Sequence, residues 1–288
     1  MIDFVALPLA GVLVISIVGS LAAGRLEPVV GARIHAVLLA SVVTATVPTL
    51  WLIGLSGIAH TDLHNPVVDW SYHLLPDHTP AGAIIGGVSL GLAITGTVRA
   101  VRVVLLHRRL RCVDTPPMQT VESDDAFAYT IPGPAGTIAV STGLRRALDD
   151  DEYAVVIEHE RAHARHRHDR YKLLGLLAVA FVPPTHVIAR RLDFALERWA
   201  DEAALRRTGN DRRLAAHTIA KVAMATTVPA GVLGFDGRGP AARASALLEP
   251  AAPSVTSRLQ ASALTIVTLA LALYQLHHSA VFAHHLLP

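Results

Sequence analysis

Four long apolar stretches constrain the fold of this 288-residue chain more than any other feature. They run from about residue 4 to 23, 35 to 55, 81 to 105 and 261 to 283. Each is long enough to cross a hydrocarbon core of about 30 Å as a helix. Only 17% of the residues are charged, against about 25% in ordinary soluble domains. We therefore expect a mainly α, multi-span helical membrane protein that lies in a lipid bilayer.

The stretches divide the chain into three parts. Residues 1–106 hold three predicted transmembrane helices, residues 107–258 form a domain of their own, and residues 259–288 hold a C-terminal transmembrane helix. The first stretch lacks the basic start of a signal peptide, so we expect it to be retained. The middle part, at about 150 residues, is long enough for one domain with its own core.

Arginine placement predicts the orientation in the membrane. Arg25 and Arg33 lie between the first two stretches, several arginines crowd the end of the third, and the loop 56–80 has no Lys or Arg. The positive-inside rule then places residues 107–258 in the cytoplasm and both termini outside. The net charge of +2 is too small to indicate a nucleic-acid partner. The lone Cys112 cannot form an internal disulfide.

The middle domain contains two motifs typical of a zinc site. His159 and His163 flank Glu160 in an H-E-x-x-H motif, which on a helix turns both imidazoles to one face, with Glu160 beside the open position of a bound Zn²⁺. Glu197 offers a third ligand, and Asp201 can accept the free ring N–H of a ligating histidine. The motifs predict one zinc ion per chain. The alternative is a basic, histidine-rich surface helix followed by an ordinary amphipathic helix.

The residues before the first motif predict a strand hairpin. Residues 126–130 and 137–141 alternate like strands, and the turn 131–136 is rich in Pro and Gly. A helix is expected from Leu144, and the acidic run 149–152 should start the next helix, which carries the histidines. We expect a substrate to add as a strand along a free edge formed by Thr137, Ile138, Ala139 and Val140.

Residues 173–189 form a further apolar run between the two motifs. If it crossed the bilayer once, His163 and Glu197 would lie on opposite sides and could not share an ion. We therefore predict a re-entrant or interfacial hairpin that turns at Pro183 and Pro184, where proline breaks a helix. A core helix of the soluble domain is the alternative.

Residues 126–201 resemble the BlaR/MecR-type membrane metallopeptidases, metallopeptidase family 56. The resemblance rests on the hairpin, the run Ser141–Leu144, the acidic helix start and both motifs. It implies a cytoplasmic, gluzincin-like α+β zinc peptidase domain in a bacterial cytoplasmic membrane. In such a domain His159, His163 and Glu197 bind zinc, and Glu160 is the general base and acid. The HtpX/Ste-type quality-control peptidases share these motifs and are the close rival. The order of three spans, domain and one span favours the first family.

One departure from the antirepressor type affects the expected function. Those sensors carry a penicillin-binding domain after the last span, whereas this sequence ends at Pro288, so we expect no β-lactam sensing by that route. We predict a regulatory zinc metalloendopeptidase that acts in signal transduction and cleaves a cytoplasmic or membrane protein, such as a transcriptional repressor. The alternatives are an HtpX/Ste-type quality-control peptidase and a non-catalytic membrane signalling scaffold. A homodimer is one option for the oligomeric state.

Other polar residues have weaker indications. Arg243 resembles a downstream arginine of related peptidases and could donate to an oxyanion, with a surface arginine as the alternative. His166 and His168 are expected to be solvated or close to lipid headgroups. On the predicted topology half of the histidines face outside, where they could sense metal or protons or simply lie at the interface. These are His60, His64, His73, His78, His277, His278, His284 and His285.

Overall fold

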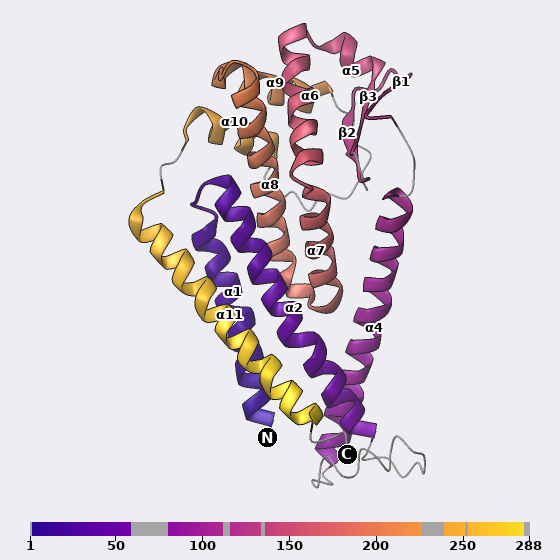
Figure 1. Cartoon of the computed structure of the whole chain (residues 1–288), viewed down its shortest axis with the longest axis vertical. Coiled ribbons are helices and arrows are strands. Elements are labelled where there is room, and N and C mark those ends of the chain that lie inside the picture. Colours follow the sequence, from indigo (N-terminus) through magenta and orange to yellow (C-terminus); the bar gives the residue numbers. More distant parts are fainter. Residues whose placement is uncertain are drawn as a thin grey trace.

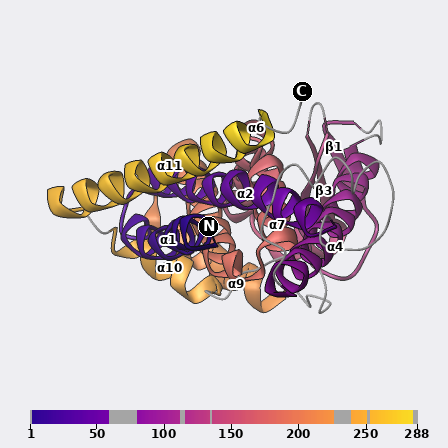
Figure 2. The ribbon, with the colours of Figure 1, turned by 90° about the horizontal axis from the view of Figure 1, so that it is seen from below.

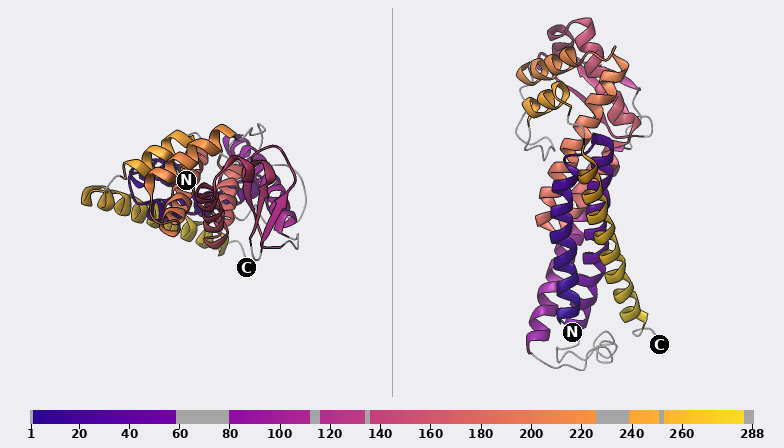
Figure 3. Two further views of the ribbon diagram at one scale, coloured as in Figure 1. Left: turned by 90° about the horizontal axis from the view of Figure 1, so that it is seen from above. Right: turned by 90° about the vertical axis from the view of Figure 1, so that its left-hand side faces the viewer.

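The computed structural model describes residues 2–58, 80–111, 116–133, 136–225, 239–250 and 253–284. Long helices form a stalk, and the shorter helices and the sheet form a head at one end of it (Figure 1). The side view in Figure 3 shows the same two parts, with α1 beginning and α11 ending at the far end of the stalk from the head. Helix dominates both parts, so the mainly α prediction is confirmed.

Four helices build the stalk: α1 (Ile2–Ala23), α2 (Pro28–Ile58), α4 (Pro80–Arg111) and α11 (Val255–His284). Seen from below in Figure 2, α11 lies across α1 and α2, while α4 lies on the other side of α2. Among the described residues, Pro28–Leu55, Ile84–Arg111 and Val255–Val281 are long and apolar enough to cross a membrane. These segments correspond to the second, third and fourth predicted spans. The described apolar part of α1, Pro8–Ala23, is shorter.

Apolar side chains cover the outside of the stalk. Ile84 is 68% exposed and Ile266 66%, as expected of side chains that face lipid. Inside the stalk the helices approach closely at glycines. A Cβ on Gly96 of α4 would stand 2.5 Å from Cδ1 of Phe181, so glycine at this position allows the close approach of the next helical segment.

That segment belongs to a helical hairpin that follows the first motif and carries the second motif on its second helix. It consists of α7 (His168–Phe181), the short 3₁₀ turn η1 (Pro183–Thr185) and α8 (His186–Arg207). The predicted turn at the prolines is confirmed. The hairpin packs between α2 and α4, and one buried cluster joins Leu39 of α2 to Ala178, Leu192, Leu196 and Trp199. The stalk and the metal motifs therefore share one core. The depth of the hairpin in a bilayer stays a prediction.

The head contains a three-stranded sheet made of β1 (Met118–Val121), β2 (Ala128–Ile131) and β3 (Thr137–Ser141). The strand order is β1-β3-β2, with β3 antiparallel to β2 and parallel to β1. The predicted hairpin is therefore confirmed, whereas β1 was not foreseen.

The expected substrate edge on β3 is wrong. Thr137, Ile138, Ala139 and Val140 are buried in the central strand, where hydrogen bonds to β1 and β2 occupy both edges. The edge of β3 that was expected to be free is paired with β1, which lies upstream in the chain. Among the described strands, β2 is the edge strand that contacts α6, the helix that carries both histidines.

The head helices are α5 (Thr142–Ala147), α6 (Asp150–Arg165), α9 (Arg212–Ala225) and α10 (Pro240–Leu248). Helix α6 begins as the acidic run predicts. Asp149 accepts a hydrogen bond from the backbone of Glu152, and the Glu152 side chain accepts one from the backbone of Asp149, which is a capping box. This cap fixes the start of the helix that carries both histidines.

Candidate metal centre and active site

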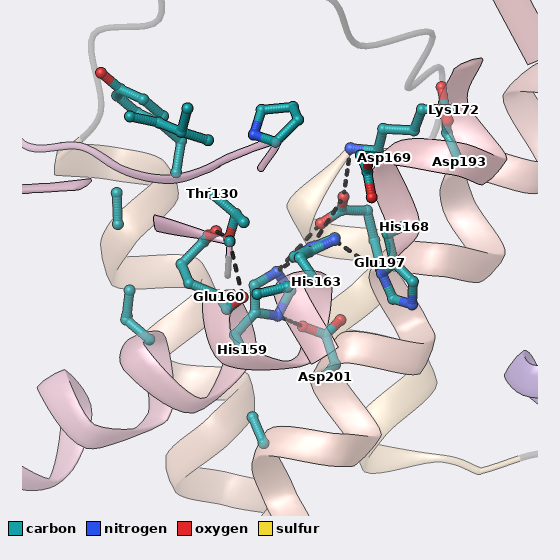
Figure 4. Close-up of a pocket in the computed structure, with 18 of the residues that line it drawn as sticks. Thr130, His159, Glu160, His163, His168, Asp169, Lys172, Asp193, Glu197 and Asp201 are labelled. Carbon is teal, nitrogen blue, oxygen red and sulfur yellow. Dashed lines mark hydrogen bonds and ion pairs between the residues drawn. The ribbon is translucent and has the colours of Figure 1, made fainter. Parts of the chain in front are cut away.

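Helices α6 and α8 bring three potential metal ligands together. His159 and His163 lie one turn apart on α6, and Glu197 reaches them from α8 (Figure 4). One donor atom from each residue lies within 4.8 Å of the others. The two Nε2 atoms are 3.1 Å apart, and the Glu197 oxygens lie 3.4 Å from His159 Nε2 and 3.5 Å from His163 Nε2.

This donor set fits a zinc ion. Tetrahedral zinc with Zn–N bonds of about 2.0–2.1 Å holds its two ligating nitrogens about 3.3 Å apart, close to the spacing seen here. Two imidazoles and one carboxylate are also the ligands of catalytic zinc sites, which keep a fourth position open. Among the described residues, no other group of His, Cys, Asp and Glu has this spacing.

Asp201 and Arg243 form a layer behind the ligands. Asp201 Oδ1 lies 2.9 Å from His159 Nδ1, on the opposite side of the ring from the Nε2 that faces Glu197. Arg243 of α10 donates to both Asp201 oxygens, at 2.9 Å and 2.6 Å, and its Nη1 lies 3.2 Å from Glu197 Oε2. The guanidinium thus bridges two carboxylates. The oxyanion role of Arg243 stays a prediction.

The charges in this layer perturb the titration of the metal-free site. Burial opposes protonation of His159, but hydrogen bonds to Asp201 and Glu197 outweigh it and raise its pKa to about 9. Burial favours the neutral form of Glu197, yet the charges on His163 and Lys172 hold its pKa well below the usual value. Burial would raise the pKa of Asp201, but Arg243 and His159 together outweigh it and lower that pKa. Both carboxylates are therefore ionised and ready to hold cations.

Glu160 lies beside the ligands and is tied to the sheet. Its side chain is buried, and the Thr130 hydroxyl lies 2.7 Å from Glu160 Oε2 and 2.9 Å from the Glu160 carbonyl oxygen. Thr130 belongs to β2, so the edge strand and the expected general base are coupled directly. The sequence does not indicate Thr130 as a site residue, because Thr130 lies 30 residues before Glu160 in the chain.

Two residues of α7 also reach the site. Lys172 Nζ lies 3.3 Å from Glu197 Oε1. His168 corrects an expectation, since it is buried rather than solvated, and its Nδ1 lies 2.8 Å from Nδ1 of His163. Burial, with a smaller effect of His163, lowers the pKa of His168 to about 2, so its ring is neutral. His166 is partly buried, and its ring packs against the Trp199 ring in a tilted arrangement.

A cavity of about 790 Å³ opens onto the candidate metal site. Its walls include the three ligands, Glu160 and the whole of β2. Apolar side chains from two stalk-side helices complete it: Val103, Leu106 and Leu110 of α4, and Leu173 and Leu176 of α7. The cavity therefore extends from the metal ligands to the head end of the stalk.

Most histidines of the proposed outer sensor fall outside the described residues. His60, His64, His73, His78 and His285 lie there, and the side chain of His284 is not described. His277 and His278 are on α11, with ring centroids 6.3 Å apart. Cys112 also lies outside the described residues.

The part of the chain that contains the candidate metal ligands is similar to known proteins. Residues 106–202 match Peptidase family M48, whose members are zinc-dependent. A "Protease HtpX homolog" of Thermoplasma acidophilum is 43% identical over 63 residues, which are 22% of this chain and 19% of that protein. The chain thus matches about a fifth of the length of that relative. No solved structure matched.

The comparisons support a membrane-associated metalloprotease. The curated relative is a homolog of HtpX, the rival type named above, and the residues matched by the M48 family model contain the candidate ligands. The resemblance to the antirepressor type stays a prediction.

Proposed function

We propose that this chain is a membrane-anchored, zinc-dependent endopeptidase with one zinc ion per chain. The observation that carries the proposal is the meeting of two Nε2 atoms and the Glu197 carboxylate beside Glu160. His159, His163 and Glu197 would hold the ion, and Asp201 would orient His159. A non-catalytic scaffold would not need an acid at position 160 beside this ligand set.

The residues of the site support a hydrolytic mechanism. When bound, Zn²⁺ acidifies water and polarises a peptide carbonyl. Glu160 then takes the proton of the attacking water and returns it to the leaving amine. Thr130 holds the Glu160 carboxylate for both transfers through its 2.7 Å contact.

An extended substrate would add to the sheet along β2. Ala128–Ile131 is an edge strand and lines the cavity together with the ligands. Main-chain hydrogen bonds along such an edge place few demands on sequence. The apolar wall formed by Val103, Leu106 and Leu110 would accept hydrophobic side chains from a segment next to the membrane.

The placement in the membrane belongs to the same proposal. The head would lie in the cytoplasm, residues 173–189 would form a re-entrant or interfacial hairpin, and the termini would lie outside. A protein with this architecture could be regulatory and cleave a repressor, as the antirepressor resemblance implies. Quality control of membrane proteins is the second candidate, favoured by the similarity to the Thermoplasma acidophilum HtpX homolog.

The test uses the full chain purified in detergent. We expect about one zinc per chain by metal analysis and cleavage of an unfolded protein such as casein. Glu160→Gln should keep the zinc and lose cleavage, because Glu160 moves protons and does not bind the ion. The matched control is Glu158→Gln, which alters an acid that pairs with Arg161 on the same helix. A folded sample without zinc, or cleavage by Glu160→Gln at the wild-type rate, would overturn the proposal.

The two substrate classes can be separated in the host. A winged-helix repressor encoded beside this chain, and cleaved only when Glu160 is intact, would support the regulatory role. Accumulation of misfolded membrane proteins in the Glu160→Gln strain would support quality control instead.

A further inference from the structure

His163 makes a contact that the proposed mechanism does not use. Its Nδ1 lies 2.8 Å from Nδ1 of His168, the first residue of α7 (Figure 4). His168 is 1% exposed, and its ring lies 4.9 Å from the Trp199 ring, centroid to centroid. Its other nitrogen, Nε2, has no hydrogen-bond partner among the described residues. A buried polar atom without a partner requires an explanation.

We propose that His168 is a positioning residue that fixes the tautomer and the rotation of His163 for metal binding. The proposal rests on the proposed function, because it takes His163 as a zinc ligand through Nε2. His159 has a charged partner, Asp201. The proposal gives His163 a neutral partner, His168.

The tautomers follow from the two contacts. His163 Nε2 faces His159 and Glu197, so its lone pair must be free for the ion. A neutral imidazole then carries its proton on Nδ1. That proton points at His168 Nδ1, which must accept it, and His168 must therefore be protonated on Nε2. The unpaired Nε2–H is the consequence of reserving Nδ1 for His163.

The backbone and the aromatic neighbours hold His168 in place. Arg167, between α6 and α7, has a φ of 55°, a left-handed conformation that is uncommon for a residue with a side chain. The chain changes direction at Arg167, between α6 and α7. Helix α7 therefore begins with the His168 ring beside His163. The Tyr171 ring lies edge-on to the His168 ring, with the centroids 6.4 Å apart, and Trp199 packs beside it. The acceptor therefore cannot easily rotate away.

Because His168 is neutral and Asp201 is charged, His163 and His159 should differ in basicity as metal ligands. Asp201 carries a charge and pulls on the ring proton of His159, which makes that imidazole the more basic ligand. His168 orients His163 without adding a second negative charge next to Glu197. Loss of His168 should therefore affect the geometry and affinity of the metal site while leaving its charge unchanged.

The experiment separates the acceptor from the ring packing. His168→Phe keeps an aromatic ring against Trp199 but removes the acceptor, whereas His168→Asn keeps an acceptor oxygen and loses the ring. The control is His166→Phe, which changes a histidine that also packs on Trp199 but has no described contact with a ligand. Zinc affinity is measured in the full chain with a competing chelator, and the site geometry by the absorption spectrum of Co²⁺-substituted protein.

We expect His168→Phe to weaken zinc binding by about 10- to 100-fold and to change the Co²⁺ spectrum. His168→Asn should recover most of the affinity and the wild-type spectrum, and His166→Phe should match the wild type. Equal affinity in His168→Phe and the wild type would overturn the proposal. So would a ring-nitrogen NMR spectrum of zinc-loaded wild type with the His168 proton on Nδ1, a measurement that holds even if His168→Phe does not fold. A folded wild type without zinc would instead defeat the proposed function.

Discussion

Asp201 and His159 face each other across a 2.9 Å contact between Oδ1 and Nδ1, while the Nε2 of the same ring faces Glu197 at 3.4 Å. The carboxylate therefore holds the ring proton on the side away from the candidate metal position. Arg243 fixes that carboxylate with two hydrogen bonds. The relationship makes Asp201 an orienting residue and Glu197 a ligand, which gives the two acids different expected phenotypes.

Replacing each acid by its amide tests this division. Asp201→Asn keeps an acceptor oxygen but loses the charge, so we expect the fold to remain and zinc affinity to fall by about 10- to 100-fold. Glu197→Gln removes a ligand and should lose nearly all bound zinc. Metal analysis after dialysis against a chelator distinguishes the two variants. If Asp201→Asn lost its zinc while Glu197→Gln kept it, the two assignments would have to be exchanged.

Zinc affinity should depend on pH through His159. In the metal-free protein its pKa is raised to about 9, so below that pH a proton occupies the nitrogen that the ion needs. Affinity should therefore increase as the pH rises towards 9, by about tenfold per unit from this proton, and level off above it. Asp201→Asn removes the main cause of the raised pKa and should flatten the dependence between pH 7 and 9. Chelator competition across this range provides the measurement, and a pH-independent wild-type affinity would contradict the assignment.

Thr130→Val tests the link between the edge strand and the general base. Valine has nearly the same shape but cannot donate to Glu160 Oε2, which accepts at 2.7 Å. We expect zinc content to stay at the wild-type value and kcat to fall by about tenfold, because the base loses its orientation. Thr120→Val, the same change at an exposed position of β1, is the control. An unchanged kcat in Thr130→Val would show that the contact does not serve catalysis.

Reporter fusions test the orientation. Fusions at Asp69 and Pro288 should lie outside the cell and one at Asp124 inside, because the arginines flank the stretches on one side only. Asp69 and Pro288 lie outside the described residues, whereas Asp124 is in the head just before β2. An inside signal at Asp69 would reverse the proposed topology.

Local signals in the sequence were sufficient for much of the fold. The spacing of His159 and His163 places them on one helix face because the period of a helix is local. The run Asp149–Glu152 predicts the start of α6 because a capping box needs only four residues. Pro183 and Pro184 predict the turn between α7 and α8 because proline cannot continue a helix. Three of the four predicted spans form helices that are long and apolar enough to cross a membrane, since length and composition decide that property.

Other parts of the site depend on contacts between distant segments. The strand β3 is central because β1 pairs with it, and the sequence pattern of β1 is weak. The proposed substrate edge is therefore on β2 rather than on β3. Arg243 meets Asp201 from a separate helix, and Thr130 meets Glu160 from the sheet. His168 is buried because Trp199 of α8 packs against its ring. Sequence patterns report on neighbours within a few turns, whereas these contacts exist only once the helices and the sheet have packed together.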